Sequence, residues 1–365
     1  MIAHQHLLVV SLVALAPVWG PLAAQEAPPR VILFIGDGTG VGAWTAARVS
    51  ADALAVDLLP VGGLVDTREG SGKITDSAAS ATALATGIHT FNGAISVGPD
   101  SQPVTTVLEL AEARGMATGL VATSSITHAT PAAFSAHVTQ RDEQFEIARQ
   151  MAGQGIDVLL GGGRRFFDPA VRPDSADLLG GLARRSTLVD SPAAFRALDL
   201  DSVTTLVGLF ADDGMPAVAD RAPTLAEMTA AALAILNRDP DGFFLMVEGS
   251  QPDWREHDND SLAAVATEVL DLDRAVAVAL EYCARHPETL LVVTADHETG
   301  GLSVVADSTG AFAAVYAGGD HTAALVPLFA RGPGAERFGG MHEIDAIGRY
   351  LQESVTRTST GPVAR

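Results

Sequence analysis

The sequence predicts an α/β fold, a three-layer α/β/α sandwich with a central, mostly parallel β-sheet. Short segments that are apolar along their whole length alternate with Ala-rich segments at helical spacing through most of the 365 residues. A strand that is apolar throughout is buried on both faces, which is typical of a parallel sheet covered by helices. With 47% hydrophobic and 18% charged residues, the chain also has the composition of a globular protein with an ample core.

Six segments have the composition of buried strands, and five have the apolar spacing of helices. The strand segments are aliphatic and bounded by polar or Gly-containing residues, and the helical segments are rich in Ala and Leu. Strands are expected at residues 31–35, 117–122, 157–160, 243–247, 290–294 and 325–330. Helices are expected at residues 77–86, 107–113, 143–152, 225–236 and 262–284. The segment 168–213 fits neither pattern well and is expected to be an excursion from the core.

The amino-terminal residues predict an exported protein. Residues 7–16 form an apolar run, and small residues follow it up to Ala24. The run is too short for a membrane-spanning helix, which needs about 20 apolar residues, and is typical of a secretory signal peptide. We therefore expect a signal peptide at residues 1–24, a single domain at residues 25–365, and a periplasmic or secreted location. No later segment is long and apolar enough to span a membrane.

The charge balance excludes one class of function. The chain has 23 Lys and Arg residues against 44 Asp and Glu residues, a formal net charge of −21 at pH 7. Such an acidic surface is unsuited to binding DNA, RNA or anionic lipid, so no nucleic-acid-binding surface is expected. The same charge would repel an anionic substrate, and composition alone leaves that conflict open. The single cysteine, Cys283, cannot form an internal disulfide and is expected in the core, so the fold depends on its core and on metals.

Polar residues follow three of the predicted strands at the point where each strand ends. Asp37 comes after the strand at residues 31–35, Glu248 after 243–247, and Asp296 with His297 after 290–294. In open α/β sheets the carboxyl ends of the strands form one edge, where binding sites are found. The sequence therefore predicts a rim of carboxylates and imidazoles at that edge.

A pair of metal-binding residue types lies at helical spacing after the strand at 243–247. Asp253 and His257 are four residues apart, one helical turn, so both side chains can face the same point. With His321 from a distant segment they would form a three-ligand N/O zinc site with one open position. Taken alone, an Asp and a His at this spacing are more often a surface acid–base pair.

The segment at residues 75–82 (TDSAASAT) predicts a helix start that is suited to an anion. Asp76 is a good N-cap residue, Ser77 then lies in the first turn, and Gly87 ends the helix. The free N–H groups and positive dipole end of a helix favour both a serine alkoxide and a phosphate. An ordinary capped packing helix is the alternative for this segment alone.

The segment at residues 38–43 (GTGVGA) supports a rival interpretation. It follows a predicted strand and matches the G-x-G-x-x-A pattern of dinucleotide-binding oxidoreductases, with Asp57 further along the chain. The rival does not explain the Asp and His pairs elsewhere.

Taken together, these segments resemble the alkaline phosphatase family. Residues 74–83 (ITDSAASATA) resemble the nucleophile motif of that family, and the other matching segments occur in the family's order over residues 30–350. Those segments are Gly36-Asp37-Gly38, Thr130-Pro131 with Arg141, Glu248-Gly249, Asp253 with His257, Asp296-His297-Glu298, and His321-Thr322. The ordered set is far more specific than any of its members.

The resemblance implies a role for each matching residue. Ser77 would be the nucleophile that forms a phosphoserine, Arg141 would clamp the phosphate oxygens, and Asp76 would orient Arg141. The implied metal ligands are Asp37, Asp296 and His297 for one zinc, Asp253, His257 and His321 for a second zinc, and Asp37, Thr130 and Glu248 for a third ion, usually magnesium.

Two positions depart from the enterobacterial members of the family. His128 stands where those enzymes carry Asp, and Trp254 stands where they carry Lys; both are expected at the substrate-binding side of the site. The combination resembles some marine and cold-adapted bacterial members. An imidazole near a hard-oxygen site favours zinc over magnesium as the third ion. The missing lysine charge predicts weaker binding of the phosphate product.

The resemblance implies an exported phosphoric monoester hydrolase that acts at alkaline pH and takes small phosphate monoesters as substrates. A phosphodiesterase or nucleotide pyrophosphatase of the same superfamily is the nearest alternative; Ser77, Thr130 and Glu248 together weigh against it. A non-catalytic exported protein that binds metal or phosphate is the alternative outside enzymes. The family is commonly dimeric, so a monomer and a homodimer both stay open.

Overall fold

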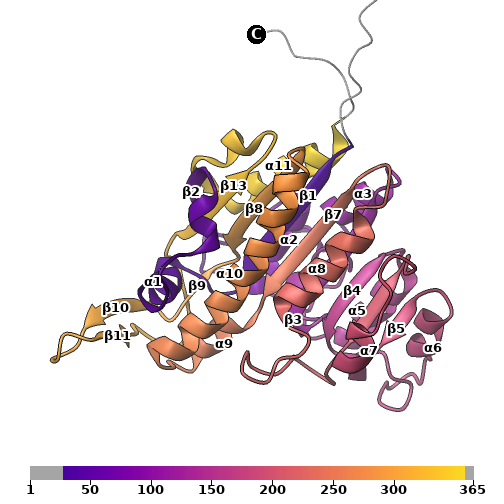
Figure 1. Cartoon of the computed structure of the whole chain (residues 1–365), viewed down its shortest axis with the longest axis horizontal. Coiled ribbons are helices and arrows are strands. Elements are labelled where there is room, and N and C mark those ends of the chain that lie inside the picture. Colours follow the sequence, from indigo (N-terminus) through magenta and orange to yellow (C-terminus); the bar gives the residue numbers. More distant parts are fainter. Residues whose placement is uncertain (1–27, 358–365) are drawn as a thin grey trace, which may run out of the picture.

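The computed structural model describes residues 28–357, so the predicted signal peptide at residues 1–24 lies outside the described residues. The centre of the molecule is a 10-stranded β-sheet with helices packed on both of its faces (Figure 1). The predicted α/β/α sandwich is confirmed. The prediction of a single domain at residues 25–365 stays a prediction.

The sheet is mostly parallel, as predicted. One strand, β13, runs antiparallel to both of its neighbours, and the other neighbouring strands run parallel. In spatial order the strands are β14 (Gly340–Glu343), β2 (Val61–Asp66), β13 (Val326–Arg331), β8 (Thr289–Ala295), β1 (Arg30–Gly36), β7 (Phe243–Gly249), β3 (Ala117–Ser125), β4 (Val158–Gly162), β6 (Leu206–Leu209) and β5 (Thr187–Val189).

Each face of the sheet has its own hydrophobic core. In β1, the side chains of Val31, Leu33 and Ile35 join one core and those of Ile32 and Phe34 join the other, because successive strand residues point to opposite faces. The first core is covered by α2 (Ser77–Thr86), α3 (Val107–Glu112), α5 (Gln144–Gly153) and α11 (Ile344–Thr356). The second is covered by α1 (Val41–Ser50), α8 (Leu225–Leu236) and α10 (Leu262–Arg285). The shorter helices are η1 (Ala55–Leu58), α4 (Ala129–Ala132), η2 (Arg164–Phe166), α6 (Leu178–Ala183), α7 (Pro192–Arg196), α9 (Gln251–His257) and η3 (Ala335–Phe338).

The segment 168–213 is not an excursion from the core, and that prediction is wrong. It contains α6, β5, α7 and β6, and its two strands extend the parallel sheet at one edge, β6 beside β4 and β5 outside it. The elements are three to six residues long. Such short elements carry too little periodicity to be recognised in the sequence.

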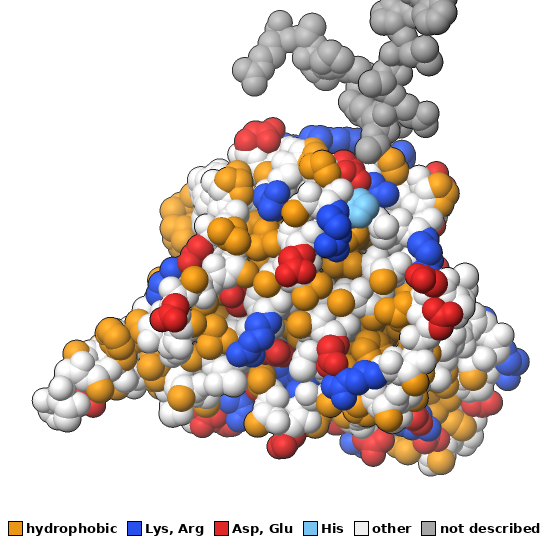
Figure 2. All heavy atoms as spheres, in the orientation of Figure 1, with side chains coloured by type: hydrophobic (Ala, Val, Ile, Leu, Met, Phe, Trp, Pro, Cys, Tyr) orange, Lys and Arg blue, Asp and Glu red, His pale blue; other side chains and the backbone are white. Residues whose placement is uncertain are grey.

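A two-stranded arm projects from the body beside α1 (Figure 1). It consists of β10 (Ser303–Ala306) and β11 (Phe312–Val315), which pair antiparallel. The arm connects two very short strands, β9 (Glu298–Thr299) and β12 (His321–Thr322). Several apolar side chains on the arm are exposed, Phe312 most of all at 59%, and Figure 2 shows them along the projection. This arm was not predicted from the sequence.

α10 is the longest helix among the described residues, with 24 residues. Its buried side is apolar and includes Cys283, which is 1% exposed as predicted. Acidic and basic side chains are mixed over the face of the molecule shown in Figure 2. Among the residues described, no helix combines the length and the apolarity that a membrane crossing requires.

Candidate metal centre and active site

The carboxyl ends of β1, β7 and β8 bring the predicted rim residues together. β1 pairs with β7 on one side and β8 on the other, and Gly36 lies opposite both Gly249 and Ala295. Asp37 and Asp296 therefore follow neighbouring strands at the same level, and Glu248 is the last residue but one of β7. The local sequence explains the geometry, because each strand is apolar up to this edge and polar directly beyond it.

The first group of candidate ligands is Asp37, Asp296 and His297. His297 Nε2 lies 3.5 Å from Asp37 Oδ1 and 3.2 Å from Asp296 Oδ2, and all three side chains are fully buried. Both carboxylate oxygens of Asp37 and Oδ2 of Asp296 have no hydrogen-bond partner among the described residues. Buried carboxylate oxygens without partners are costly unless a cation binds them.

The second group is Asp253, His257 and His321. Asp253 and His257 are one turn apart on α9, and His257 Nε2 lies 3.3 Å from Asp253 Oδ1. His321 on β12 brings its Nε2 atom to 3.1 Å from His257 Nε2 and 3.7 Å from Asp253 Oδ1. The other ring nitrogen of each histidine faces a backbone carbonyl. His257 Nδ1 lies 2.6 Å from Gly319 O, and His321 Nδ1 lies 2.9 Å from Thr75 O. Both imidazoles therefore turn Nε2 toward the centre of the group, as metal-binding histidines do.

A third group shares Asp37 with the first. Asp37, His128 and Glu248 each have a ligand atom within 4.8 Å of the others. Glu248 Oε2 accepts a hydrogen bond from Ser124 Oγ at 3.1 Å, whereas Glu248 Oε1 and the buried Thr130 Oγ1 have no partner among the described residues. Oxygen ligands of this kind suit magnesium, and the imidazole of His128 also suits zinc.

Burial and mutual repulsion shift the pKa values of these groups. Burial raises the pKa of Asp37 well above its ordinary value, and the neighbouring carboxylates Asp296 and Asp253 raise it further. Burial likewise raises the pKa of Glu248 to about 7 and lowers that of His297 to about 3. The imidazole of His297 is therefore neutral and able to bind a metal ion. The clustered carboxylates repel one another when ionised, so a bound cation would stabilise their ionised form.

Ser77 lies at the first position of α2, beside the first group. Asp76 caps the helix, since its Oδ1 atom accepts a hydrogen bond from Ala79 N at 2.9 Å, and the helix ends at Gly87 with φ +70°, as predicted. Ser77 Oγ lies 3.2 Å from His297 Nε2, and Ser77 is 2% exposed. The hydroxyl group thus faces the candidate metal ligands from a helix N-terminus, where negative charge is stabilised.

Arg141 reaches the same place from the loop before α5. Its Nη1 atom donates to Asp76 Oδ2 at 3.1 Å, and Nη2 lies 3.3 Å from His128 Nε2. Asp76 Oδ2 also accepts from Gly93 N at 3.0 Å. Asp76 therefore contacts the helix, a loop and the guanidinium group at once, and the side chain of Arg141 remains 25% exposed.

The rings of Trp254 and His128 lie edge to face, with centroids 6.5 Å apart. Trp254 packs on Gly214, where an added Cβ atom would lie 2.5 Å from the indole ring. Gly214 follows the segment 168–213, so this segment helps to position Trp254 beside the third group. His128 in turn contacts Arg141, with Nε2 3.3 Å from Arg141 Nη2.

The glycines of the rival dinucleotide motif have another explanation. A Cβ atom at Gly40 would lie 2.2 Å from Glu298 Cγ, and one at Gly42 would lie 2.0 Å from the carbonyl oxygen of Leu302. These glycines let the start of α1 pack closely on the segment that follows Asp296 and His297. A nucleotide is not needed to account for them.

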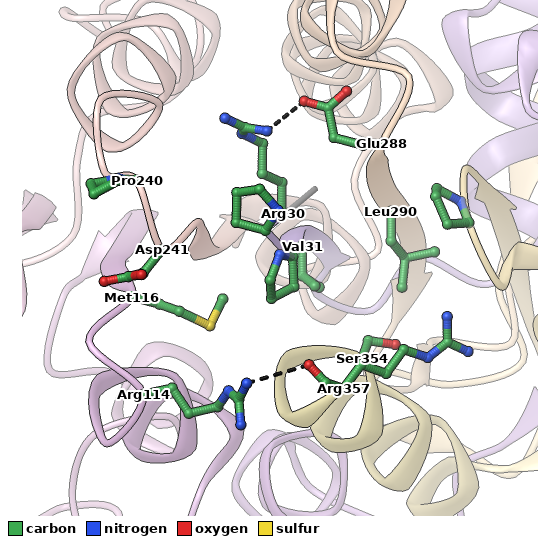
Figure 3. Close-up of a pocket in the computed structure, with 13 residues that line it drawn as sticks. Arg30, Val31, Arg114, Met116, Pro240, Asp241, Glu288, Leu290, Ser354 and Arg357 are labelled. Carbon is green, nitrogen blue, oxygen red and sulfur yellow. Dashed lines mark hydrogen bonds and ion pairs between the residues drawn. The ribbon is translucent and has the colours of Figure 1, made fainter. Parts of the chain in front are cut away.

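A pocket of about 490 Å³ lies at the amino ends of the central strands, opposite the candidate site at their carboxyl ends. Figure 3 shows the residues that line it. It is lined by residues at the amino ends of strands, among them Arg30 of β1, Met116 before β3, Asp241 before β7 and Leu290 of β8. None of the predicted site residues lines it. The candidate active site is instead the rim of ligands at the carboxyl edge.

Several contacts in the site were not predicted. Thr299 donates a hydrogen bond to Asp253 Oδ1 at 2.5 Å, and Glu298 accepts hydrogen bonds from Leu302 N and Thr322 Oγ1. Glu256 is fully buried and neither carboxylate oxygen has a partner among the described residues. Its spacing of three residues from Asp253 was the available signal. His128 was expected at the substrate side, and the structure also places it in the third ligand group.

The fold and these groups define a class of α/β/α proteins with clustered candidate metal ligands beside a serine at a helix N-terminus. The sequence profile described as "Alkaline phosphatase" matches residues 29–318. The chain belongs to the alkaline phosphatase family.

Individual relatives agree with this assignment. Alkaline phosphatase 3 of Bacillus subtilis is 42% identical over 301 residues, which cover 78% of this chain and 64% of the relative. Streptomycin-6-phosphate phosphatase of Streptomyces griseus is 37% identical, with 89% of each chain covered. The first three curated relatives are longer than this chain, which spans 51% to 64% of their length.

Solved structures of the family are similar as well. The alkaline phosphatase of the Antarctic bacterium TAB5 has a TM-score of 0.84 and 34% identity, over 92% of this chain and all of that one. A variant of that enzyme, in which one histidine is replaced by glutamate, has magnesium bound in its M3 site.

Proposed function

We propose that the protein hydrolyses phosphate monoesters to an alcohol and inorganic phosphate at alkaline pH. The observation that carries the proposal is the position of Ser77, with its hydroxyl oxygen 3.2 Å from His297 Nε2 at the N-terminus of α2 and Arg141 held nearby by Asp76. A nucleophile, an anion-binding guanidinium group and two N/O ligand groups are the parts that phosphoryl transfer requires.

The ligand groups fit three cations. Asp37, Asp296 and His297 would hold one zinc, and Asp253, His257 and His321 would hold a second. Asp37, Thr130 and Glu248 would hold magnesium, and the imidazole of His128 beside them makes zinc an alternative third ion. Bound zinc would supply Lewis acidity that lowers the pKa of the attacking hydroxyl group and stabilises the leaving oxygen.

The residues of the chain perform two displacements at phosphorus. Ser77 Oγ forms a bond to phosphorus, the ester P–O bond breaks, and the alcohol leaves. Arg141 pairs with two non-bridging oxygens, which a planar guanidinium group fits better than an ammonium group does. Water then attacks the phosphoserine, the Oγ–P bond breaks, and Ser77 is restored. Two inversions give overall retention of configuration at phosphorus.

The proposal resolves the conflict between an acidic chain and an anionic substrate. Three divalent cations and Arg141 carry more positive charge than the four carboxylates among the ligands carry negative charge. The pocket is therefore cationic although the chain has a net charge of −21. Export of a mature chain that begins after Ala24 is part of the proposal, and the amino-terminal sequence of protein recovered outside the cytoplasm tests it.

Comparison of a monoester with a diester tests the proposed activity. We expect the zinc- and magnesium-loaded protein to hydrolyse p-nitrophenyl phosphate far faster than bis-p-nitrophenyl phosphate. Ser77→Ala removes the nucleophile and should lower kcat by about 10³-fold or more while zinc binding persists. Faster hydrolysis of the diester would favour a phosphodiesterase. Zinc binding without hydrolysis would favour a non-catalytic metal-binding protein.

A further inference from the structure

Thr299 occupies the junction between the first and second ligand groups. It lies on the two-residue strand β9, two residues after His297, and pairs directly opposite His321 in the short ladder with β12. Its side chain is fully buried. The backbone of Thr299 therefore fixes a ligand of the second group, while its side chain lies between the two groups.

The hydroxyl group of Thr299 contacts one ligand from each group. Thr299 Oγ1 lies 2.5 Å from Asp253 Oδ1 and 3.3 Å from His297 Nδ1. A hydroxyl group has one proton to donate, and an ionised carboxylate can only accept. The proton therefore goes to Asp253, and Oγ1 accepts a hydrogen bond from the Nδ1–H group of His297.

This arrangement decides which nitrogen of His297 is free to ligate. With the proton on Nδ1, the lone pair of Nε2 points to the side where Ser77 Oγ and Asp296 Oδ2 each lie 3.2 Å away. The hydroxyl proton also fixes the rotation of the Asp253 carboxylate, whose Oδ1 atom faces His257 Nε2 at 3.3 Å. One hydroxyl group thus orients a ligand in each group.

His297 differs from the two other histidines in this respect. The Nδ1–H groups of His257 and His321 donate hydrogen bonds to backbone carbonyls, those of Gly319 and Thr75 respectively. Only His297, among these three, is oriented by a side chain, so only its orientation can be removed by a substitution that leaves the backbone intact. The ring of His297 also stacks on that of His321, with centroids 3.6 Å apart.

We infer that Thr299 is a positioning residue that couples the two zinc-ligand groups, by orienting His297 in one and Asp253 in the other. The inference rests on the proposed function, because it needs zinc at both groups. Substitution of residues that hold metal ligands typically costs about 10–100-fold in metal affinity or activity.

Zinc titration of two Thr299 variants tests the inference. Thr299→Val keeps the shape of the side chain and removes the hydroxyl group, and Thr299→Ser keeps the hydroxyl group. With zinc alone as the probe and a chromophoric chelator as competitor, Thr299→Val should lose about 10–100-fold in affinity for both tightly bound ions. Thr299→Ser should restore most of that loss. Activity on p-nitrophenyl phosphate is measured alongside.

Thr229→Val is the matched control. Thr229 is also a fully buried threonine, but its hydroxyl group donates to Leu225 O within α8. The Thr229→Val variant should therefore bind zinc with the affinity of the wild type. An affinity of Thr299→Val within about twofold of the wild type, or a loss that Thr299→Ser does not restore, would overturn the inference. Loss of affinity at only one of the two ions would overturn the coupling.

A measurement on the wild type keeps the inference testable if Thr299→Val does not fold. In zinc-loaded protein labelled with [¹⁵N]histidine, the ring of His297 should carry its proton on Nδ1 and bind metal through Nε2; the opposite assignment contradicts the inference. The proposed function fails separately, if the wild type neither binds zinc nor hydrolyses the monoester. If the wild type is active and Thr299→Val binds zinc equally well, the inference about Thr299 is wrong but the proposed function is not.

Discussion

The carboxylate of Asp76 makes hydrogen bonds to three separate parts of the site. It caps α2 through Ala79 N, accepts from Gly93 N and pairs with Arg141. The cap could be predicted from the sequence, because an Asp before an Ala-rich run is a common helix start. The pairing with Arg141 across 65 residues of chain could be expected only from the family resemblance, since spacing contains no information on such a contact.

Trp254 provides a prediction at the scale of one residue. The indole ring lies beside His128 and carries no charge that could hold phosphate. Trp254→Lys introduces a cation near the proposed phosphate site and should lower the inhibition constant of inorganic phosphate severalfold, because a partly buried charge pair contributes about 1 kcal/mol or more. Steady-state inhibition of p-nitrophenyl phosphate hydrolysis by phosphate measures it.

Trp254→Gln serves as the control for loss of the indole ring. It should not tighten phosphate binding, because it adds no charge. Equal inhibition constants for the wild type and Trp254→Lys would show that the missing lysine does not weaken product binding.

At the scale of elements, the start of α1 packs closely on the segment that carries the metal ligands. A Cβ atom at Gly42 would lie 2.0 Å from the carbonyl oxygen of Leu302, a backbone atom that cannot turn away. Gly42→Ala should therefore force α1 and this segment apart and lower the free energy of unfolding by about 1–3 kcal/mol. Urea unfolding measures the change.

Gly62→Ala is the matched control for Gly42→Ala. Gly62 lies on β2 with nothing within 4 Å of an added Cβ atom, so its substitution should leave stability unchanged or raise it slightly. If both variants unfold at the same urea concentration, the contact between Gly42 and Leu302 does not constrain α1.

Elements with strong local signals were predicted almost to the residue. The helices at 77–86 and 225–236 match α2 and α8, because both segments are rich in Ala and begin after a capping residue. The short elements of residues 168–213 and the arm of β10 and β11 were missed, since runs of three to six residues carry little periodicity. The direction of β13 could not be predicted either, because a strand's own residues do not encode the direction of its neighbours.

At the scale of the whole molecule, the metal ions should contribute to stability in a pH-dependent way. In the metal-free protein, burial raises the pKa of Glu248 to about 7 and that of Asp37 well above its ordinary value. The folded state then binds more protons than the unfolded state near neutral pH, so the free energy of unfolding falls as pH rises through 7. Bound cations remove this penalty, because they favour the ionised carboxylates.

Calorimetry of the chelator-treated and metal-loaded protein at pH 7 and pH 8.5 measures this effect. Both values are above the ordinary pKa of histidine, so the neutral imidazoles of His128 and His297 add little to the difference. We expect the gain in Tm from zinc and magnesium to be larger at pH 8.5. Glu248→Gln should reduce the pH dependence of the metal-free protein. A gain that is the same at both pH values, or smaller at pH 8.5, contradicts the expectation.

The sequence by itself determined the α/β/α class, the strand ends that carry Asp37, Glu248 and Asp296, and the helix start at Ser77. These features are local, because hydrophobic periodicity and capping act between residues that are close in the chain. The tertiary structure decided how segments hundreds of residues apart meet. It set the distance of 3.1 Å between His321 Nε2 and His257 Nε2, gave His128 a place in the third ligand group, and put Thr299 between the first two groups. Such contacts follow from strand order and loop packing, which no local pattern encodes.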